Sequence, residues 1–315
     1  MGFGRGSGFL ARVALVILLG VPAGVAAKEC GGAVACACGD SVHGSAVLAQ
    51  DLVGCITGLR VKNSAVLDCA GHAIVAAVPG GNEGVVVEAT GAVVRACTVS
   101  GFKTGIRVRG GGGNLVAGND VVGNTRYGIE LAVATTHNEI RDNLVQDSGD
   151  EGIHVGTRAD WNVIAGNEIA GSKRENLYLL DVVGCTIADN RISGGGAAAM
   201  YVKHAGRNVF TDNEVTDRPV QVRGESEDNV FTGNRLSRAG FLFQAYNDAR
   251  RGWKGPRRNQ IRNGSVVDVK TCFRFEGAAA NEVSGVLVDG CQPMAQKKAG
   301  GIAAVNNAVD VIPGT

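Results

Sequence analysis

Aromatic residues are scarce in this chain, since 9 Phe, 4 Tyr and 2 Trp are spread over 315 residues. Proline and methionine are rarer still, with 6 and 3 residues. So few large side chains cannot fill the thick core of a globular domain, yet a hydrophobic content of 45% argues against disorder. Together with 48 glycines, this composition favours small aliphatic residues buried in thin layers.

The chain also lacks an excess of charge of either sign, because 31 basic residues stand against 30 acidic ones. Loss of an N-terminal segment carrying two of the arginines would leave 29 basic residues and a formal charge of −1. A polyanion therefore finds no general attraction, and we expect no nucleic-acid partner.

Only one long apolar run occurs, the 15 residues from Val13 to Ala27, which follow Arg5 and Arg12. The run ends in the small-residue pattern of a signal-peptidase site, so we predict a signal peptide over residues 1–27 and a periplasmic or secreted protein. A membrane anchor is the alternative, but it needs about 18 apolar residues, and this run contains Gly20, Pro22 and Gly24. We therefore expect no membrane span.

All nine cysteines follow this segment, and four of them (Cys30, Cys36, Cys38 and Cys55) lie close together. In an oxidising compartment such a cluster indicates disulfides that staple a terminus, so residues 28–57 are predicted to form a cap and entry coil. A zinc site is disfavoured because no CxxC pair recurs. Nine is an odd number, so at least one thiol stays free.

A four-residue phrase of the type Gly-Ile-x-Val recurs every 20 to 24 residues through most of the chain, as in GIRV at 105, GIEL at 128 and GIHV at 152. A second phrase, Asn-Val-x-x-x-Asn-x-Val, follows it in most units. Apolar residues alternate with period two, which favours short strands over helices. Short strands repeated at this period bury their apolar faces by stacking on their neighbours. We predict a solenoid of about ten coils over residues 58–310, followed by a tail at 311–315.

Asparagines recur at two phases of the repeat, and we expect them to form ladders at the turns, where Asn tolerates left-handed geometry and its amide can bond to the next coil. Cys185 falls at a ladder phase and is predicted to be a buried free thiol. We expect Cys38 to pair with Cys55. Cys272 is expected to pair with Cys291, since their separation of 19 residues is nearly one coil.

These repeats resemble the bacterial right-handed parallel β-helix proteins, the group that contains pectate-lyase-like enzymes and the periplasmic accessory proteins of nitrous oxide reductase maturation. The entry coil, CGDSVHGSAVLAQDLVGC at 38–55, is similar to that of many secreted members. The resemblance covers residues 38–310 and implies an all-β right-handed parallel β-helix. It does not fix an activity, because lyases, hydrolases, epimerases and non-enzymes share these repeats.

In the Gly-Ile-x-Val phrase the residue x points outwards, which places a row of polar and aromatic side chains on consecutive rungs. An acidic polysaccharide laid along the axis would stack on the aromatic residues and present its charges to the basic ones. We predict substrate-binding roles for Arg107, Glu130, Tyr178 and Tyr201.

Candidates for chemistry come from the preceding turn, from the row itself and from the neighbouring outward row: Asp150 and Glu151, then His154, then Lys203 and Arg223. Asp150, Glu151 and His154 would provide a general base or a calcium site beside a uronate carboxylate. A solvated turn is the simpler interpretation of Asp150 and Glu151, and the sequence favours it. The scattered histidines predict no transition-metal site, copper included, so the expected cofactor is none, with calcium left open.

One coil is longer than the others and contains YNDARRGWKGPRR, in which Trp253 is flanked by basic residues. This loop is either a wall over an anionic glycan or a mobile insertion. Two functional hypotheses remain: a monomeric lyase or epimerase acting on an acidic polysaccharide, and a non-catalytic cell-envelope binding or scaffold module.

Overall fold

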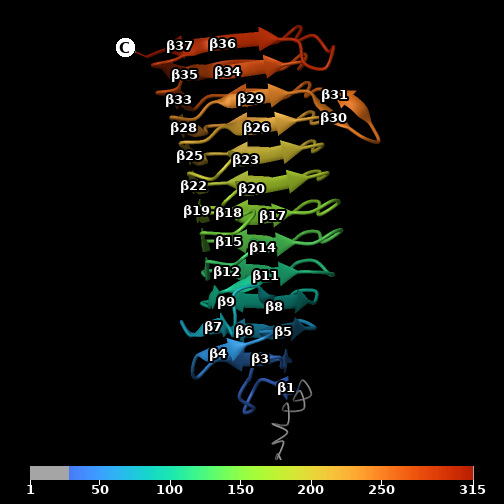
Figure 1. Cartoon of the computed structure of the whole chain (residues 1–315), viewed down its shortest axis with the longest axis vertical. Coiled ribbons are helices and arrows are strands. Elements are labelled where there is room, and N and C mark those ends of the chain that lie inside the picture. The colour runs from blue at the N-terminus through green and yellow to red at the C-terminus, as the bar shows by residue number, and fades with distance from the viewer. Residues whose placement is uncertain (1–27, 315) are drawn as a thin grey trace, which may run out of the picture.

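The computed structural model describes residues 28–314, which stack into one rod of coils (Figure 1). The predicted signal peptide falls outside the described residues. Between residues 28 and 314 every regular element is a β-strand, and no helix of a length and apolarity suited to crossing a membrane occurs there. The all-β solenoid predicted from the repeats is confirmed.

The first sheet runs the length of the rod with all its strands parallel. Its order is β1 (Glu29–Cys30), β2 (Ser41–Val42), β5 (Leu59–Lys62), β8 (Gly81–Glu88), β11 (Phe102–Val108), β14 (Tyr127–Leu131), β17 (Ile153–Val155), β20 (Glu175–Leu180), β23 (Ala198–Lys203), β26 (Val220–Arg223), β29 (Phe241–Gln244), β34 (Thr271–Glu276) and β36 (Gln292–Lys297).

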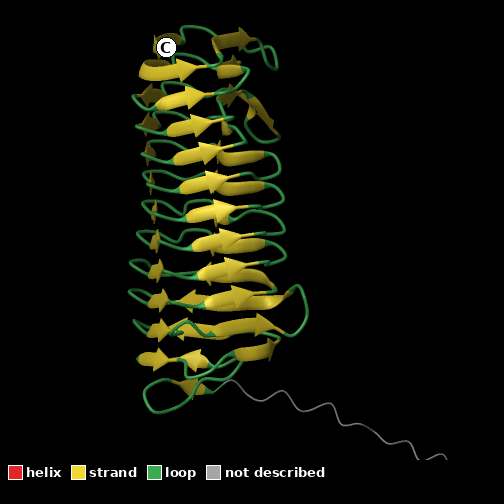
Figure 2. Ribbon diagram, turned by 90° about the vertical axis from the view of Figure 1, so that its left-hand side faces the viewer, coloured by secondary structure: helices red, strands yellow, loops and turns green. Residues whose placement is uncertain are grey.

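Two further strands complete each central coil and build two more parallel faces (Figure 2). The second face contains β3 (Ser45–Val47), β6 (Val66–Asp68), β9 (Val93–Arg95), β12 (Leu115–Ala117), β15 (Glu139–Arg141), β18 (Val163–Ala165), β21 (Thr186–Ala188), β24 (Val209–Thr211), β27 (Val230–Thr232) and β32 (Gln260–Arg262). The third contains β4 (Leu52–Cys55), β7 (Ala73–Ala76), β10 (Thr98–Ser100), β13 (Asp120–Val122), β16 (Leu144–Gln146), β19 (Glu168–Ala170), β22 (Arg191–Ser193), β25 (Glu214–Thr216), β28 (Arg235–Ser237) and β33 (Ser265–Val267). Both faces end on β35 (Glu282–Asp289), which pairs with β37 (Ala308–Pro313).

The stack is taller than the ten coils expected, because the first sheet has 13 strands. The extra rungs at its ends, β1, β2 and β36, do not carry the Gly-Ile-x-Val phrase from which the coils were counted. Each central coil contains three strands, since the second phrase spans two of them with a turn between them.

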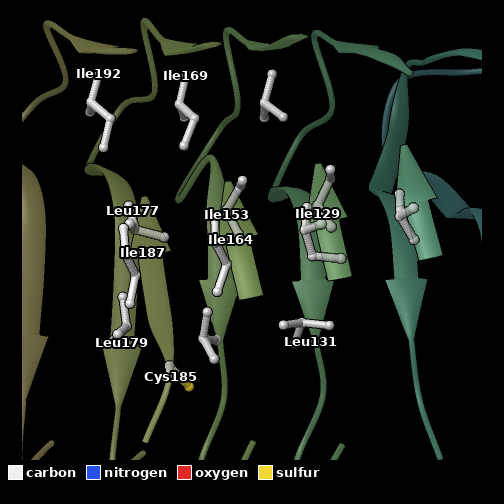
Figure 3. Close-up of a cluster of buried hydrophobic side chains, with 14 of the residues drawn as sticks. Ile129, Leu131, Ile153, Ile164, Ile169, Leu177, Leu179, Cys185, Ile187 and Ile192 are labelled. Atoms are coloured by element: carbon white, nitrogen blue, oxygen red, sulfur yellow. The ribbon is translucent and has the colours of Figure 1, made fainter. Parts of the chain in front are cut away.

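The core consists of single columns of aliphatic residues, one from each coil. Ile106, Ile129, Ile153 and Leu177 stand in register on the first sheet and are fully buried (Figure 3). Towards the C-terminal end Phe241 and Phe273 continue this column, with ring centres 5.8 Å apart. The phenylalanines of residues 28–314 are all buried within the rod.

Two asparagine ladders lie buried at the turns, as predicted. Asn143 shows the pattern: its Nδ2 donates to Oδ1 of Asn167 at 2.9 Å and to the carbonyl oxygen of Val116 at 3.0 Å. Its backbone N–H donates to the same Oδ1 of Asn167. The expected left-handed geometry belongs instead to the residue before the ladder asparagine, such as Asp142 with φ 53°. That residue makes the turn, so the asparagine can point inwards.

Four disulfides join Cys30 to Cys36, Cys38 to Cys55, Cys69 to Cys97 and Cys272 to Cys291. Both predicted pairs are among them. Cys185 is the free cysteine of the described residues and is buried at a ladder position, as expected. Three disulfides lock the first coils and one locks the last.

A two-stranded antiparallel hairpin is the one addition to the coils, formed by β30 (Tyr246–Asp248) and β31 (Gly252–Lys254). It corresponds to the longest interval of the repeat. In Figure 1 it projects beyond the carboxyl ends of the first-sheet strands and folds back towards earlier coils.

Candidate functional site

The predicted row of outward side chains occupies consecutive rungs of the first sheet. Arg107 on β11 pairs with Glu130 on β14, and Glu130 with His154 on β17. Tyr178 on β20 and Tyr201 on β23 continue the row. The sequence repeat located all five because alternation along a strand sends the residue between two buried ones outwards.

Four rings of this face stack along the rod axis. Tyr127 lies 4.5 Å from His154, His154 lies 5.3 Å from Tyr178, and Tyr178 lies 5.2 Å from Tyr201, with interplanar angles between 16° and 24°. Each inner ring therefore covers the faces of its neighbours, and Tyr201 is only 9% exposed. The stack therefore presents ring edges and hydroxyl groups to the surface, in place of the open ring faces that sugar stacking would need.

Arg107 and Glu130 neutralise each other at the lower end of the row. Nε of Arg107 lies 3.1 Å from Oε2 of Glu130, and its Nη1 donates to Glu83 at 3.0 Å. Burial raises the pKa of Glu130, and Arg107 opposes that rise. One guanidinium thus serves two carboxyl groups, so this end of the row offers no free positive charge to an anionic ligand.

Two buried carboxyl groups lie beside the stack on consecutive coils, and one arginine covers both. The side chains of Glu151 and Glu175 are each 4% exposed. Arg174 places Nη1 at 3.5 Å from Glu151 and Nε at 3.6 Å from Glu175, and it donates to Asp150 at 3.2 Å. The solvated turn favoured from the sequence is wrong for Glu151, because the neighbouring ring stack and Arg174 remove it from water.

Burial gives these groups unusual protonation at neutral pH. Burial, and then the nearby Asp150, raise the pKa of Glu151 to about 7. Burial also raises the pKa of Glu175. The pKa of His154 falls to about 4, chiefly through burial and then through Arg126. Near pH 7, His154 is therefore uncharged while Glu151 exchanges between its acid and carboxylate forms.

The cluster keeps several polar atoms without hydrogen-bond partners. These buried atoms include Oε2 of Glu151, Oε2 of Glu175 and Nδ1 of His154, the last lying 3.9 Å from the Glu151 oxygen. Buried polar atoms of this kind are costly, so a partner such as water or a ligand hydroxyl would stabilise them.

Tyr127 and Glu175 belong to this arrangement but were not among the predicted site residues. Both stand just before the Ile or Leu of the phrase, where the turn enters the strand and period two no longer applies. Sequence offered one signal, the coil period of 24 residues that separates Tyr127 from Glu151 and Glu151 from Glu175.

Lys203, Arg223 and Trp253 lie at different distances from the cluster. Arg223 donates from Nη1 to the hydroxyl of Tyr201 at 3.2 Å, so it joins the upper end of the stack. Nζ of Lys203 lies 4.0 Å from the ring centre of Tyr246 on the hairpin. Trp253 is on the same hairpin, and the structure does not bring it to the ring stack.

A groove continues the row beyond Tyr201. After Gln221 the next outward residues are Leu242 and Arg274. They line a cavity of about 510 Å³ together with Pro219 and Lys270. An apolar floor with basic walls suits a sugar ring that carries a negative charge.

Comparison with known proteins places the chain in a family context. The family model described as NosD, periplasmic copper-binding protein, matches residues 42–171 and, in an overlapping match, residues 75–267. The resemblance inferred from the repeats is thereby confirmed. A search among curated protein sequences returns no match.

Several solved structures share the fold at low sequence identity. Alginate lyase from Paenibacillus sp. str. FPU-7 is 17% identical, with a TM-score of 0.57, and the match covers 90% of this chain and 99% of that one. The A-module of mannuronan C-5 epimerase AlgE6 from Azotobacter vinelandii is 14% identical, with a TM-score of 0.54 over 91% and 88%. The GH87 alpha-1,3-glucanase catalytic unit from Streptomyces thermodiastaticus strain HF3-3 is 12% identical, with a TM-score of 0.58, and this chain spans 64% of it. These likenesses establish the common fold.

The copper in the family description finds no matching donor set in this chain. Across residues 28–314 no group of three or more His, Cys, Asp or Glu side chains is arranged to hold a metal ion. The sulfur of Cys185 is buried, and His154 is stacked between two tyrosines. We therefore derive no chemistry from copper.

Proposed function

The chain belongs to the NosD family of periplasmic β-helix proteins, and we propose that it binds an acidic polysaccharide along the first sheet and exchanges a proton with it through Glu151. The observation that carries this proposal is the pair of buried carboxyl groups, Glu151 and Glu175, beneath Arg174. The fold shared with an alginate lyase and a mannuronan epimerase supports the choice of a uronate polymer. The four disulfides and the periplasmic family description support an exported protein.

Arg174 can link substrate binding to exposure of the base. Its side chain is 58% exposed and contacts three carboxyl groups at once. A uronate carboxylate competes for the same guanidinium, because arginine binds carboxylates with two parallel hydrogen bonds. Movement of Arg174 towards the substrate uncovers Glu151 at the moment when the uronate is in place.

A base with a pKa of about 7 suits removal of the proton next to a uronate carboxylate. Arg174 offsets the charge that develops on that carboxylate. The electron pair left by the proton then either expels the glycosidic oxygen at the β-carbon, with a new carbon–carbon double bond, or takes a proton on the opposite face. The first outcome is a lyase reaction and the second an epimerisation. In the first, the leaving oxygen takes a proton from the hydroxyl of Tyr178, whose pKa burial raises.

The rest of the sheet supplies length for a polymer. From Glu151 on the β17 coil to Leu242 on β29 the site spans four rungs, or about 19 Å at a strand spacing of about 4.8 Å. The hydroxyl group of Tyr201 accepts a hydrogen bond from Arg223. It lies between the buried carboxyl groups of Glu151 and Glu175 and the groove lined by Leu242.

The test is incubation of the protein with alginate, polygalacturonate and glucuronan, with ultraviolet absorbance to detect unsaturated ends and proton NMR to detect epimerised residues. We expect activity on one of them, and a loss of about 10³-fold in Glu151→Gln, which keeps the shape and removes the base. Glu139→Gln, an exposed carboxyl on the second face, is the matched control and should leave the rate unchanged. No reaction with any uronate polymer would refute the catalytic part.

A non-catalytic cell-envelope binding or scaffold module is the second candidate, and the burial of Tyr127 and Tyr201 in the ring stack favours a structural role for these rings. Such a module binds a polymer without chemical change, so Glu151→Gln would not affect it. Retention of the protein on a uronate affinity gel, without product in either assay, would support this candidate over the enzyme.

A further inference from the structure

A second groove lies at the carboxyl ends of the first-sheet strands. The carboxyl cluster of Asp150, Glu151 and Glu175 lies at their amino ends. The groove follows the turns after β17, β20, β23 and β26 and has a volume of about 790 Å³, within the range of about 300–1,000 Å³ found for ligand sites. Its lining includes Arg158, Asp181, His204, Arg207 and Arg251. Glu151 precedes the amino end of β17, so the two sites are separated by the width of the first sheet.

The β30–β31 hairpin forms one wall of this groove. Arg251 of the hairpin pairs with Asp181 at 2.8 Å, three rungs before the coil from which the hairpin leaves. Lys203 lies over the ring of Tyr246. The hairpin of the long interval thus contacts earlier coils through these two pairs, while Figure 1 shows it projecting beyond the carboxyl ends of the first-sheet strands.

Trp161 offers a flat aromatic surface near the groove. Its ring lies against Gly184, where a Cβ would come within 2.3 Å of two ring carbons. Gly184 follows Val183, a lining residue, and the indole remains 54% exposed. Unlike the tyrosines of the first sheet, Trp161 is not stacked with another aromatic ring, so its outer face is open to a sugar.

Two arginines of the groove, Arg158 and Arg207, are available to an anion. Asp181, Glu227 and Asp228 are each paired with an arginine, whereas no carboxylate of residues 28–314 comes within 4 Å of the basic groups of Arg158 or Arg207. The lining holds three guanidinium groups and four carboxylates. Arg251 pairs with Asp181, and Arg257 and Arg258, from outside the lining, pair with Glu227 and Asp228. The groove is therefore close to neutral, and Arg158 and Arg207 are the guanidinium groups of the lining that remain for an anion.

His204 adds a hydrogen-bond donor. Its side chain is 2% exposed, and Nδ1 accepts the backbone N–H of Glu225 at 3.1 Å, which assigns the proton to Nε2. The nearest carboxylate, on Asp248, is 3.6 Å from Nε2, too far for a hydrogen bond, so this buried N–H has no partner.

We propose that this groove is a second saccharide site, which holds a uronate residue with its sugar face on Trp161 and its carboxylate on Arg158 and Arg207. His204 donates from Nε2 to a ring hydroxyl. The site concerns a different surface from the carboxyl cluster and does not depend on proton transfer by Glu151.

Fluorescence can isolate this site because the chain has only two tryptophans. In a Trp253→Phe, Glu151→Gln protein, Trp161 is the one emitting indole and turnover is prevented. Titration with tetragalacturonate, tetramannuronate and tetraguluronate should give a saturable change in emission with at least one of them. The same tetrasaccharide with its carboxyl groups reduced to alcohols should bind about tenfold more weakly.

Arg207→Ala in this background should also weaken binding about tenfold, whereas Arg262→Ala, an exposed arginine on β32, should leave the Kd unchanged. Thermal unfolding of each variant checks that the fold is intact. The proposal is overturned if no uronate changes the emission, or if Arg207→Ala and carboxyl reduction leave the Kd unchanged. Uronate lyase or epimerase activity of the native protein is measured separately, so either proposal can fail alone.

Discussion

The turn between the second and third faces is stabilised differently in the first coils and in the central coils. Cys97 occupies the position of Asn119 one coil earlier, where a ladder of asparagines begins. Its backbone N–H donates to Oδ1 of Asn119. From Asn119 to Asn234 the column consists of asparagines, whereas Cys97 is bonded to Cys69 of the preceding coil. A covalent bond thus replaces the amide network where the ladder ends.

The difference follows from what each device requires. An inner ladder asparagine such as Asn143 bonds to both neighbouring coils, because it donates to the asparagine of the next coil and to a carbonyl of the preceding one. A disulfide needs one partner and keeps its effect when the rest of the ladder is lacking. Coils near an end of the stack therefore gain more from cysteine, and inner coils gain more from asparagine.

Removal of the Cys69–Cys97 disulfide should have the largest effect on stability. Both sulfurs are buried, and the bond closes a loop of 28 residues. In the loop-entropy account, a double Cys69→Ala, Cys97→Ala change costs about 3–4 kcal/mol of unfolding free energy. Urea unfolding followed by circular dichroism measures it. A loss that leaves the central coils unaffected, seen as a separate early transition, is expected for a solenoid; an unchanged curve would contradict the locking role.

Asn190→Ala should come next, with a loss of about 2–3 kcal/mol. Asn190 donates to Asn213 and to the carbonyl of Ile164, and its Oδ1 accepts two hydrogen bonds from Asn167. Alanine leaves several of these buried groups unpaired, each at a cost of about 1–3 kcal/mol before relaxation. Asn247→Ala, on the exposed hairpin, is the matched control. Equal unfolding curves for the two variants would show that the ladder contributes nothing.

Tyr178→Ala should lower the unfolding free energy by about 1–2 kcal/mol, because it interrupts two ring contacts on the outside of the central coils. Tyr178→Phe keeps the rings and should be nearly neutral in stability. Thermal unfolding compares them. If Tyr178→Ala instead melts like the native protein while losing uronate affinity, the stack serves binding alone.

The smallest expected effect is the dependence of native stability on pH in the carboxyl cluster. Glu151 has its pKa raised from 4.5 to about 7, so its contribution to stability is lost as pH rises through that range. His154 has its pKa lowered from 6.5 to about 4, so its contribution is lost as pH falls through that range. The two slopes oppose each other and leave their sum nearly level between about pH 4.5 and 6.5.

Glu151→Gln separates these contributions. The variant should gain stability as pH rises from about 4 to 6.5, the direction set by His154 alone. Urea unfolding at half-unit pH steps would show the difference. Parallel profiles for the native protein and the variant would mean that Glu151 titrates normally.

The sequence predicted the fold well because every coil repeats the same physical problem. Alternation identified inward Ile129 and outward Glu130, and the coil period aligned them with their neighbours. The site was harder to predict. Burial of Glu151 depends on its contact with Arg174 and on the stacking of Tyr127 against His154 of the next coil. Periodicity within one strand predicts neither contact. The second groove needed the hairpin position, which depends on the Arg251–Asp181 contact between distant coils.

The asparagine ladder that contains Asn208, Asn229 and Asn259 also shows how little the fold depends on the length of chain between successive ladder residues. Asn208 and Asn229 are 21 residues apart, and Asn229 and Asn259 are 30 apart. The hydrogen bonds from Nδ2 to Oδ1 between their side chains nevertheless measure 2.9 and 2.8 Å. The longer interval contains the whole hairpin. The hairpin, which forms one wall of the second groove, can therefore be replaced or extended during evolution without a change in the stacking of the coils. The same tolerance makes that turn a suitable place to graft new loops when the protein is redesigned.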